Sequence, residues 1–541
     1  MKRDLLKILI FSLIAVLIMA CGGKKEIVAV PDPVWDEASI VLYANIGQLH
    51  SKGDITKVDL AKLLDCVADE NKEKAEIVAS ILLNPTDSGI TLDKPAYIAV
   101  RECDNEYKAT DMYAIIELSD ATKLDATLKQ HSDIVDNSVI SVEGDKRIIA
   151  IDNTLVVGYN SKRLAIIYKA ATSNETVDLN QMIRERLEFC SADMSRFGSR
   201  DLALYFDIDQ LLLPAEATTP IETSETEENQ AEIAKEEDIE SPYSDYFDEQ
   251  ASAIVGISFE NDTIVLSADC EGVSDLVMSQ LKVANSKHLT LLDASPIAIL
   301  NAGINGEAAA DLLDVAINKL TAKGGVISGG NEFNIYKNIA LGIIGSINGD
   351  LMLALSEADG KLIDDVIDGK RLVFTKAKAL FAADVQDDYI MQNVKTFGGG
   401  LLNKVDNNTY SLEVFGNKLS IGQREDMFYL GINNSAQAKR KSAADEEWSN
   451  NVRGSYLYAM VDFNKLFSTS FGKAALTTIY DNASTRQERE RIKEVTRSVD
   501  RFHILANGDS NAIHGECTVT LKQTNTNAFN QLLQRLAKQA E

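Results

Sequence analysis

The chain has 541 residues and is strongly acidic, with 82 Asp and Glu against 54 Lys and Arg and a formal net charge of −28. Nucleic-acid binding depends on basic side chains that neutralise phosphates, and no basic stripe interleaved with aromatic residues occurs in the sequence. We therefore expect no nucleic-acid partner. The same charge repels anionic lipid head groups unless divalent cations intervene.

The first twenty residues have the pattern of a signal peptide. Basic residues precede an apolar run over 8–19, and the small residue Ala20 stands directly before Cys21. The run is shorter than the roughly 20 apolar residues that cross a bilayer. It resembles the lipobox of bacterial lipoproteins, which implies lipid attachment at Cys21 and anchoring by acyl chains, each buried CH₂ contributing about 0.8 kcal/mol. The alternative is an ordinary secretory signal followed by an unrelated cysteine.

Residues 21–37 are expected to form a tether between the lipid and the folded body. Position 22 is Gly; in the enterobacterial lipoproteins that the segment resembles, an Asp there favours retention in the inner membrane. We therefore expect an outer-membrane lipoprotein, and the sequence leaves open whether it faces the periplasm or the cell surface.

Two further features lie outside the regular elements. The remaining cysteines are too scattered for a disulfide scaffold, so we expect buried free thiols, with a single disulfide as the alternative; they are Cys66, Cys103, Cys190, Cys270 and Cys517. The segment 215–249 carries thirteen Asp and Glu against Lys235 alone. Such a composition predicts a disordered acidic insertion, either a solvated spacer or a site for calcium or a cationic partner.

A strand that ends in Asn or Asp and turns into a helix recurs along the chain. It occurs at 40–44 before Asn45, at 202–206 before Asp207 and at 456–461 before Asp462, with a looser version at 297–300. The polar residue at each junction suits a helix N-cap. Pairing the copies gives offsets of about 255 residues, which predicts a tandem duplication with domains 38–290 and 291–541.

Helices and strands separate clearly within these halves. Apolar residues at helical spacing over 60–67 and 529–536 predict amphipathic helices, and 486–501 reads as a charged helix. We expect a meander over 139–142, 148–151 and 155–159, and a hairpin that joins 339–347 to 350–355 through Asn348 and Gly349. Short turns imply antiparallel pairing. The predicted fold class is therefore α+β, an antiparallel sheet with packed amphipathic helices.

No motif for catalysis, cofactor binding or metal binding is evident. Zinc sites need His or Cys pairs at short spacing; of the five histidines, His503 and His514 are nearest in sequence and could face each other across a hairpin, whereas His50, His131 and His288 are scattered. The glycines around 324–330 and 398–400 lack the Lys and Ser or Thr of a phosphate loop and are interpreted as turns. A Ser-His-Asp triad assembled by folding stays open, although no Gly-x-Ser-x-Gly elbow is present.

The junction from 40 to Leu49, close behind the lipobox and with a second copy later in the chain, resembles an uncharacterised family of Bacteroidota lipoproteins, domain of unknown function 4836. The resemblance implies an envelope lipoprotein whose only functional residue to carry over is Cys21. We expect a non-enzymatic binding or scaffolding protein with an envelope protein or glycan as partner. The alternatives are an envelope hydrolase acting on glycan, peptide or lipid, and a surface adhesin or nutrient-uptake accessory.

Overall fold

The computed structural model divides into two compact units, each described here by itself. The first unit holds the described residues of 38–266, together with 270–272 and 526–540; the second holds 267–269 and 273–522. The described residues are 38–54, 85–103, 109–130, 139–150, 155–169, 178–188, 194–208, 246–322, 331–365, 369–398, 400–414, 416–483, 485–522 and 526–540. The expected domain boundary at residue 290 stays a prediction.

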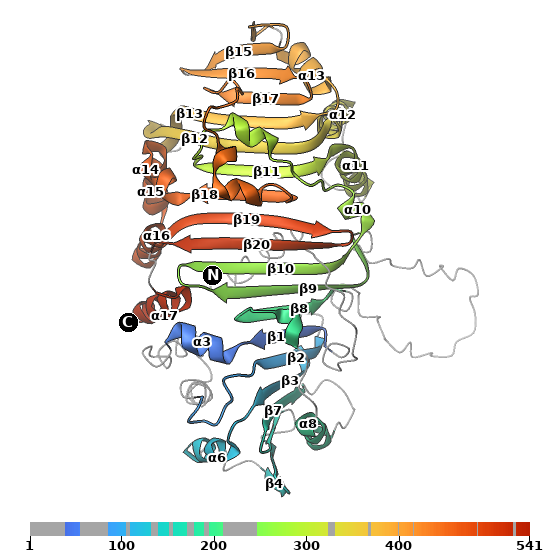
Figure 1. The fold of residues 1–541 in the computed structure, drawn as a ribbon, viewed down its shortest axis with the longest axis vertical. Coiled ribbons are helices and arrows are strands. Elements are labelled where there is room, and N and C mark those ends of the chain that lie inside the picture. The colour runs from blue at the N-terminus through green and yellow to red at the C-terminus, as the bar shows by residue number, and fades with distance from the viewer. Residues whose placement is uncertain are drawn as a thin grey trace, which may run out of the picture. The chain divides into compact units, whose positions relative to one another are not determined.

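The first unit is built on an antiparallel sheet (Figure 1). Its strands are β1 (Ile40–Ala44), β2 (Ala96–Cys103), β3 (Ala109–Glu117), β4 (Val139–Glu143), β5 (Lys146–Ala150), β6 (Leu155–Tyr159), β7 (Arg163–Lys169), β8 (Leu202–Asp207), β9 (Phe247–Phe259) and β10 (Thr263–Val273), whose residues are divided between the units. They follow the order β4-β5-β6-β7-β3-β2-β1-β8-β9-β10. The helices are α3 (Ile46–Gly53), α6 (Ala121–Gln130), α8 (Leu179–Glu188), α17 (Ala528–Ala540) and the 3₁₀ helix η2 (Met194–Phe197).

The second unit has a sheet of the same kind. Its strands are β11 (Ala298–Asn305), β12 (Ile347–Asp365), β13 (Gly369–Val385), β14 (Asn403–Lys404), β15 (Thr409–Val414), β16 (Asn417–Arg424), β17 (Met427–Ile432), β18 (Leu457–Asp462), β19 (Val499–Asp509) and β20 (Ala512–Leu521). Its helices are α10 (Asp275–Met278), α11 (Gly306–Ala322), α12 (Asn331–Gly345), α13 (Tyr389–Gly398), α14 (Phe463–Ser468), α15 (Ser470–Asn482) and α16 (Arg486–Ser498), with the 3₁₀ helices η3 (Lys287–Leu291), η4 (Ala443–Asp445) and η5 (Glu447–Asn451).

The strand order of the second unit repeats that of the first. It runs β14-β15-β16-β17-β13-β12-β11-β18-β19-β20, so adding ten to each strand number of the first unit reproduces it. The α+β fold class predicted from the sequence is confirmed. A tandem duplication predicts that the two units share one strand order. That the chain arose by such a duplication stays a prediction.

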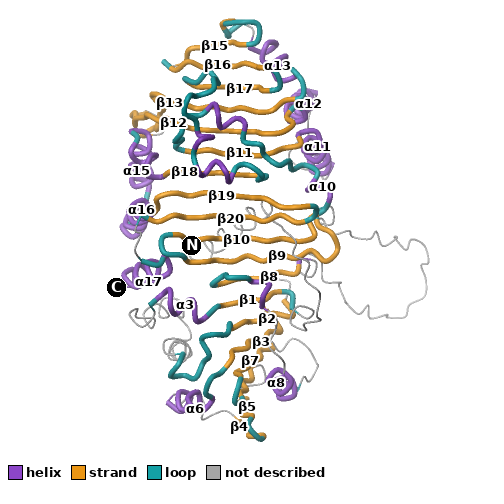
Figure 2. Tube along the Cα trace, in the orientation of Figure 1, coloured by secondary structure: helices purple, strands orange, loops and turns teal. Residues whose placement is uncertain are grey.

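The two faces of the second sheet have different surroundings. The 3₁₀ helices η3, η4 and η5 cross over β11 and β18 on one face (Figure 2) and pack there on a core that includes Met352, Leu380 and Tyr458. Side chains alternate along a strand, so their sequence neighbours point to the other face. There Leu300 and Leu353, paired across β11 and β12, are 37% and 51% exposed. Leu42 and Ile98, paired across β1 and β2 in the first unit, are similarly 42% and 36% exposed.

Several local predictions are confirmed. The side chain of Asn45 accepts a hydrogen bond from the backbone N–H of Gln48 (3.1 Å), and that of Asp462 accepts one from the backbone N–H of Lys465 (2.9 Å), so both are helix N-caps. The meander appears as β4, β5 and β6, and the amphipathic helix predicted over 529–536 is α17. The helix expected over 60–67 lies outside the described residues.

Other predictions are wrong in whole or in part. The apolar run over 339–345 belongs to α12, and Asn348 and Gly349 lie within β12, where they pair with Asn305 and Ile304 of β11, rather than forming a hairpin turn. Gly349 has φ 138°, which its missing Cβ permits. The charged helix predicted over 486–501 is present as α16, but it ends at Ser498 because β19 begins at Val499. Of the acidic segment 215–249, residues up to 245 lie outside the described part, and 247–249 belong to β9.

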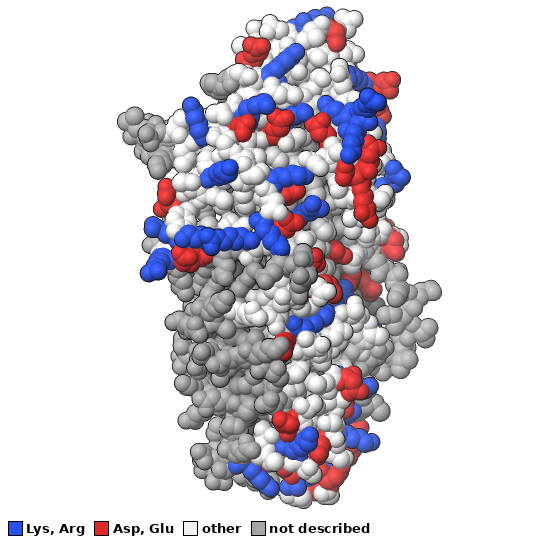
Figure 3. All heavy atoms as spheres, turned by 60° about the vertical axis from the view of Figure 1, so that its left-hand side comes forward, with Lys and Arg blue, Asp and Glu red and all other residues white. Residues whose placement is uncertain are grey.

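Charged side chains of both signs lie intermixed on the face of the second unit that Figure 3 presents. Ion pairs there join neighbouring strands or loops, such as Lys376 with Glu357 at 2.8 Å. Exposed pairs of this kind contribute little stability, typically below about 1 kcal/mol, so the sheet depends on its apolar core. In the part of the chain that the structure describes, no helix is both long and apolar enough to span a bilayer.

The assignment of faces can be tested with one substitution on each side of the sheet. Leu380 is fully buried against the 3₁₀ helices, and we expect Leu380→Ala to lower the free energy of unfolding by about 2–5 kcal/mol. Leu353→Ala on the neighbouring strand removes the same atoms from the exposed face and is expected to lower it by less than about 1 kcal/mol. Urea unfolding measures both, and equal losses would contradict the assignment.

Candidate functional site

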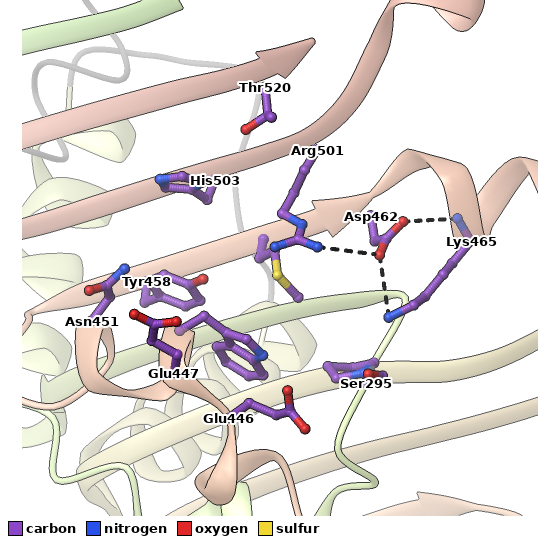
Figure 4. Close-up of a pocket in the computed structure, with 13 residues that line it drawn as sticks. Ser295, Glu446, Glu447, Asn451, Tyr458, Asp462, Lys465, Arg501, His503 and Thr520 are labelled. Atoms are coloured by element: carbon purple, nitrogen blue, oxygen red, sulfur yellow. Dashed lines mark hydrogen bonds and ion pairs between the residues drawn. The ribbon is translucent and has the colours of Figure 1, made fainter. Parts of the chain in front are cut away.

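A cavity of about 500 Å³ opens on the covered face of the second unit's sheet (Figure 4). This volume lies in the range of small-molecule sites. The residues that line it are Ser295, Pro296, Glu446, Glu447, Trp448, Asn451, Tyr458, Met460, Asp462, Lys465, Arg501, His503 and Thr520. They come from β18, β19 and β20, from α14, from the loop before β11, and from η5 with the residue that precedes it.

The floor of the cavity is set by strand register. β18 pairs antiparallel with β19, placing Met460 opposite His503 and Asp462 opposite Arg501. β19 then pairs with β20, placing Arg501 opposite Thr520. Directly paired residues of an antiparallel sheet point to the same face, so these five side chains lie side by side beneath the cavity.

Trp448 forms an aromatic wall. Its ring stacks on that of Tyr458 with centroids 5.7 Å apart and planes at 11°. Tyr458 is buried, and burial raises the pKa of its hydroxyl to about 12, so it stays protonated at neutral pH. The η5 turn that carries Trp448 is held in place by the hydroxyl of Ser449, which donates a hydrogen bond to the Ala444 carbonyl at 3.1 Å. The wall is therefore built on a fixed turn.

The charges of the lining gather at two ends. At one end Asp462 caps α14, and its Oδ2 lies 3.3 Å from Lys465 Nζ and 3.9 Å from Arg501 Nη2 (Figure 4). Two cations share one carboxylate there. At the other end are the carboxylates of Glu446 and Glu447, for which no ion pair is found among the described residues. The charges of the lining are therefore separated into a cationic group and an acidic group.

Arg501 has binding capacity that the protein leaves unused. Its Nε is buried and has no hydrogen-bond acceptor within the described part of the chain. A buried donor without an acceptor costs about 1–3 kcal/mol, more for a charged group. The Arg501 side chain as a whole is 43% exposed, so the part of its guanidinium group open to a ligand is the part other than the buried Nε.

His503 is held neutral beside this group. Burial is the largest cause that lowers the pKa of its imidazole; Arg501 lowers it further, and Glu516 raises it. A neutral ring offers one donor and one acceptor. His503 therefore adds hydrogen-bonding capacity to the cavity without adding charge.

Two of the floor positions carry apolar side chains in the first unit. Asp207 is the last residue of β8 as Asp462 is of β18, so Tyr205 corresponds to Met460 and its partner Ile254 corresponds to His503. Tyr205 is 5% exposed within the core of the first unit, and Ile254 packs against that core. The strand order therefore does not require a polar residue at the position of His503.

Sequence reasoning located little of this site. His503 and His514 lie on the same hairpin, but His503 is opposite Thr518 and His514 is opposite Asn507, so they do not face each other. His514 contacts Asp269, and His288 lies 2.9 Å from Asp384 in a buried cluster. Among the described residues, no group of three or more His, Cys, Asp or Glu is arranged to hold a metal ion.

The other candidate residues are only partly within the described structure. Cys270 is buried and Cys517 is partly buried, both as free thiols. Cys21, Cys66, Cys190 and His131 lie outside the described residues.

The fold and the site thus define an α+β protein of two similarly ordered sheets with a polar, aromatic-walled cavity in the second unit. The chain belongs to the family described as Domain of unknown function (DUF4836), whose model matches residues 33–529. No curated protein matches the chain.

Solved structures with some likeness include two crystal forms of TP0453. Form I is 11% identical, with 43% of this chain and 75% of that chain covered and a TM-score of 0.24. Form III is 12% identical, with 45% and 80% covered and a TM-score of 0.25. Scores of this size do not establish a common fold.

The low pKa of His503 predicts a pH dependence of stability. The folded state resists protonation of this ring, so His503 does not lower the free energy of unfolding well above pH 6.5. As the pH falls below the unfolded-state pKa of about 6.5, the unfolded chain binds a proton more readily than the folded one, and the free energy of unfolding decreases. We expect the wild type to lose more unfolding free energy between pH 7.5 and pH 5 than His503→Gln does. Urea unfolding at both pH values measures the difference, and parallel losses would contradict it.

Proposed function

We propose that this protein is a lipid-anchored lipoprotein of the bacterial outer membrane that binds another envelope component through the cavity of its second unit. One observation carries the binding role. The second unit has an open polar cavity lined by Met460 and His503, at the strand positions where the first unit has Tyr205 and Ile254 packed in or against its core. Leaving that space unfilled forfeits the burial of large apolar side chains, roughly 1.5–3 kcal/mol each, so a ligand is a physical reason for it.

Binding fits the arrangement of the lining better than catalysis does. Asp462 is engaged as a helix cap and ion-pair partner. Among the described lining residues, no hydrogen bond joins a hydroxyl to the His503 ring, and such a bond is what an activated nucleophile requires. The lipid anchor is proposed from the sequence around Cys21, since that segment lies outside the described residues.

The anchor is tested by Cys21→Ser in cells fed a fatty-acid analogue. We expect the wild type to be labelled and to fractionate with the outer membrane, because acyl chains on the thiol hold it there. The variant should be unlabelled and leave the membrane fraction. Label on the variant, or unchanged fractionation, would contradict the proposal.

The binding role is tested in intact envelopes by mild crosslinking of the full-length chain. Arg501→Ala should reduce recovery of the bound component at least tenfold, because Arg501 lines the cavity with a partly exposed cationic side chain. Arg453→Ala, an exposed arginine just after η5, is the matched control and should recover as much as the wild type.

Equal recovery with both variants, or no recovered component, would overturn binding through this cavity. The recovered component should also have the same mass as its free form. A shortened product that disappears with Arg501→Ala would instead favour the hydrolase alternative.

A further inference from the structure

The charge distribution of the cavity points to a class of ligand. Resting on the proposed binding role, we propose that the cavity takes a short zwitterionic peptide, with its terminal carboxylate on Arg501, its ammonium group toward Glu446 and Glu447, and its middle against Trp448. Each part of such a peptide, its two charged ends and its apolar middle, has a complementary group in the lining.

The carboxylate end follows from the excess positive charge. Arg501 and Lys465 share the single carboxylate of Asp462, so this end keeps one excess positive charge. The Arg501 side chain is 43% exposed, so its guanidinium group is open to a ligand although the Nε itself is buried. A guanidinium group presents a planar set of donors that matches the two oxygens of a carboxylate. A neutral sugar hydroxyl would satisfy the hydrogen bond without balancing the charge.

The ammonium end follows from the opposite side of the cavity. Glu446 is half-buried and Glu447 is exposed, and both line the cavity apart from the cluster of Asp462, Lys465 and Arg501 (Figure 4). Because Glu447 faces solvent, its attraction for an ammonium group is screened. The carboxylate end should therefore contribute more binding free energy than the ammonium end.

The length of the ligand follows from the volume. A cavity of about 500 Å³ has an edge of about 8 Å if treated as a cube. An extended peptide spans about 3.3–3.6 Å per residue, so two residues reach across it. Trp448 and Tyr458 supply an aromatic surface for the apolar middle of such a peptide.

The test measures binding to the purified full-length chain by calorimetry with alanyl-alanine, its C-terminal amide and its N-acetyl form. We expect amidation to weaken binding at least tenfold, which corresponds to about 1.4 kcal/mol. We expect acetylation to weaken it about threefold, since the acidic end is more exposed. Equal affinities of the free acid and the amide for the wild type would overturn the proposal.

Two variants test which residues bind the two ends of the peptide, one variant for each end. Arg501→Gln should abolish the difference between acid and amide while keeping the difference between amine and acetyl forms. The double variant Glu446→Gln, Glu447→Gln should do the reverse. Arg440→Gln, and the double variant Glu413→Gln, Glu425→Gln, change the same charges at exposed positions away from the cavity and should leave both differences intact. Thermal unfolding confirms that each variant is folded.

Failure here is distinguishable from failure of the binding role. If a neutral disaccharide binds and depends on Arg501 while no peptide form binds, the zwitterion proposal is overturned and the cavity remains a binding site. If the crosslinking experiment shows no dependence on Arg501, the binding role itself is wrong.

Discussion

The antiparallel register of β18 and β19 is the constraint on which the site depends. It places Asp462 opposite Arg501 and Met460 opposite His503, all on the face that the 3₁₀ helices cover. Because side chains alternate with a period of two, a slip of one residue in a strand turns that strand's side chains to the opposite face. Such a slip in β19 would turn Arg501 and His503 away and bring Phe502 to the covered face. The buried Tyr458 opposes a slip of β18, since it would have to leave the core and its stacking with Trp448.

Asp462 connects local structure to the site. Its side chain satisfies a free backbone N–H at the start of α14 and also lies between Lys465 and Arg501. Burying a carboxylate is costly unless it is hydrogen-bonded and paired. The helix cap and the two cations meet that requirement together, which explains how a charged group lies at the edge of an apolar core. Arg501 is thereby held beside Asp462 in the lining of the cavity.

The sequence was informative where the signal was local. The caps Asn45 and Asp462 and the meander over 139–159 follow from short patterns, and the fold class follows from the turns between strands. The hairpin at 348–349 was misjudged because an unbroken apolar run such as 339–345 suits a helix and a strand equally. The cavity could not be predicted, because it depends on η5 crossing over strands that precede and follow it in the chain. The one available signal was the alternation of Arg501, Phe502, His503 and Ile504, which indicates a strand with one polar face.

Comparison of the two units separates what the fold requires from what it merely permits. Both sheets have the same strand order, and both leave paired apolar residues half-exposed at the same two strands, Leu42 with Ile98 and Leu300 with Leu353. A feature present in both units is explained by their common topology. The polar floor under the cavity is present in the second unit, whereas Tyr205 and Ile254 of the first are packed into a core. Since the two sheets share a strand order while His503 corresponds to Ile254, the topology does not dictate a polar residue there, and the proposed ligand is a physical reason for it.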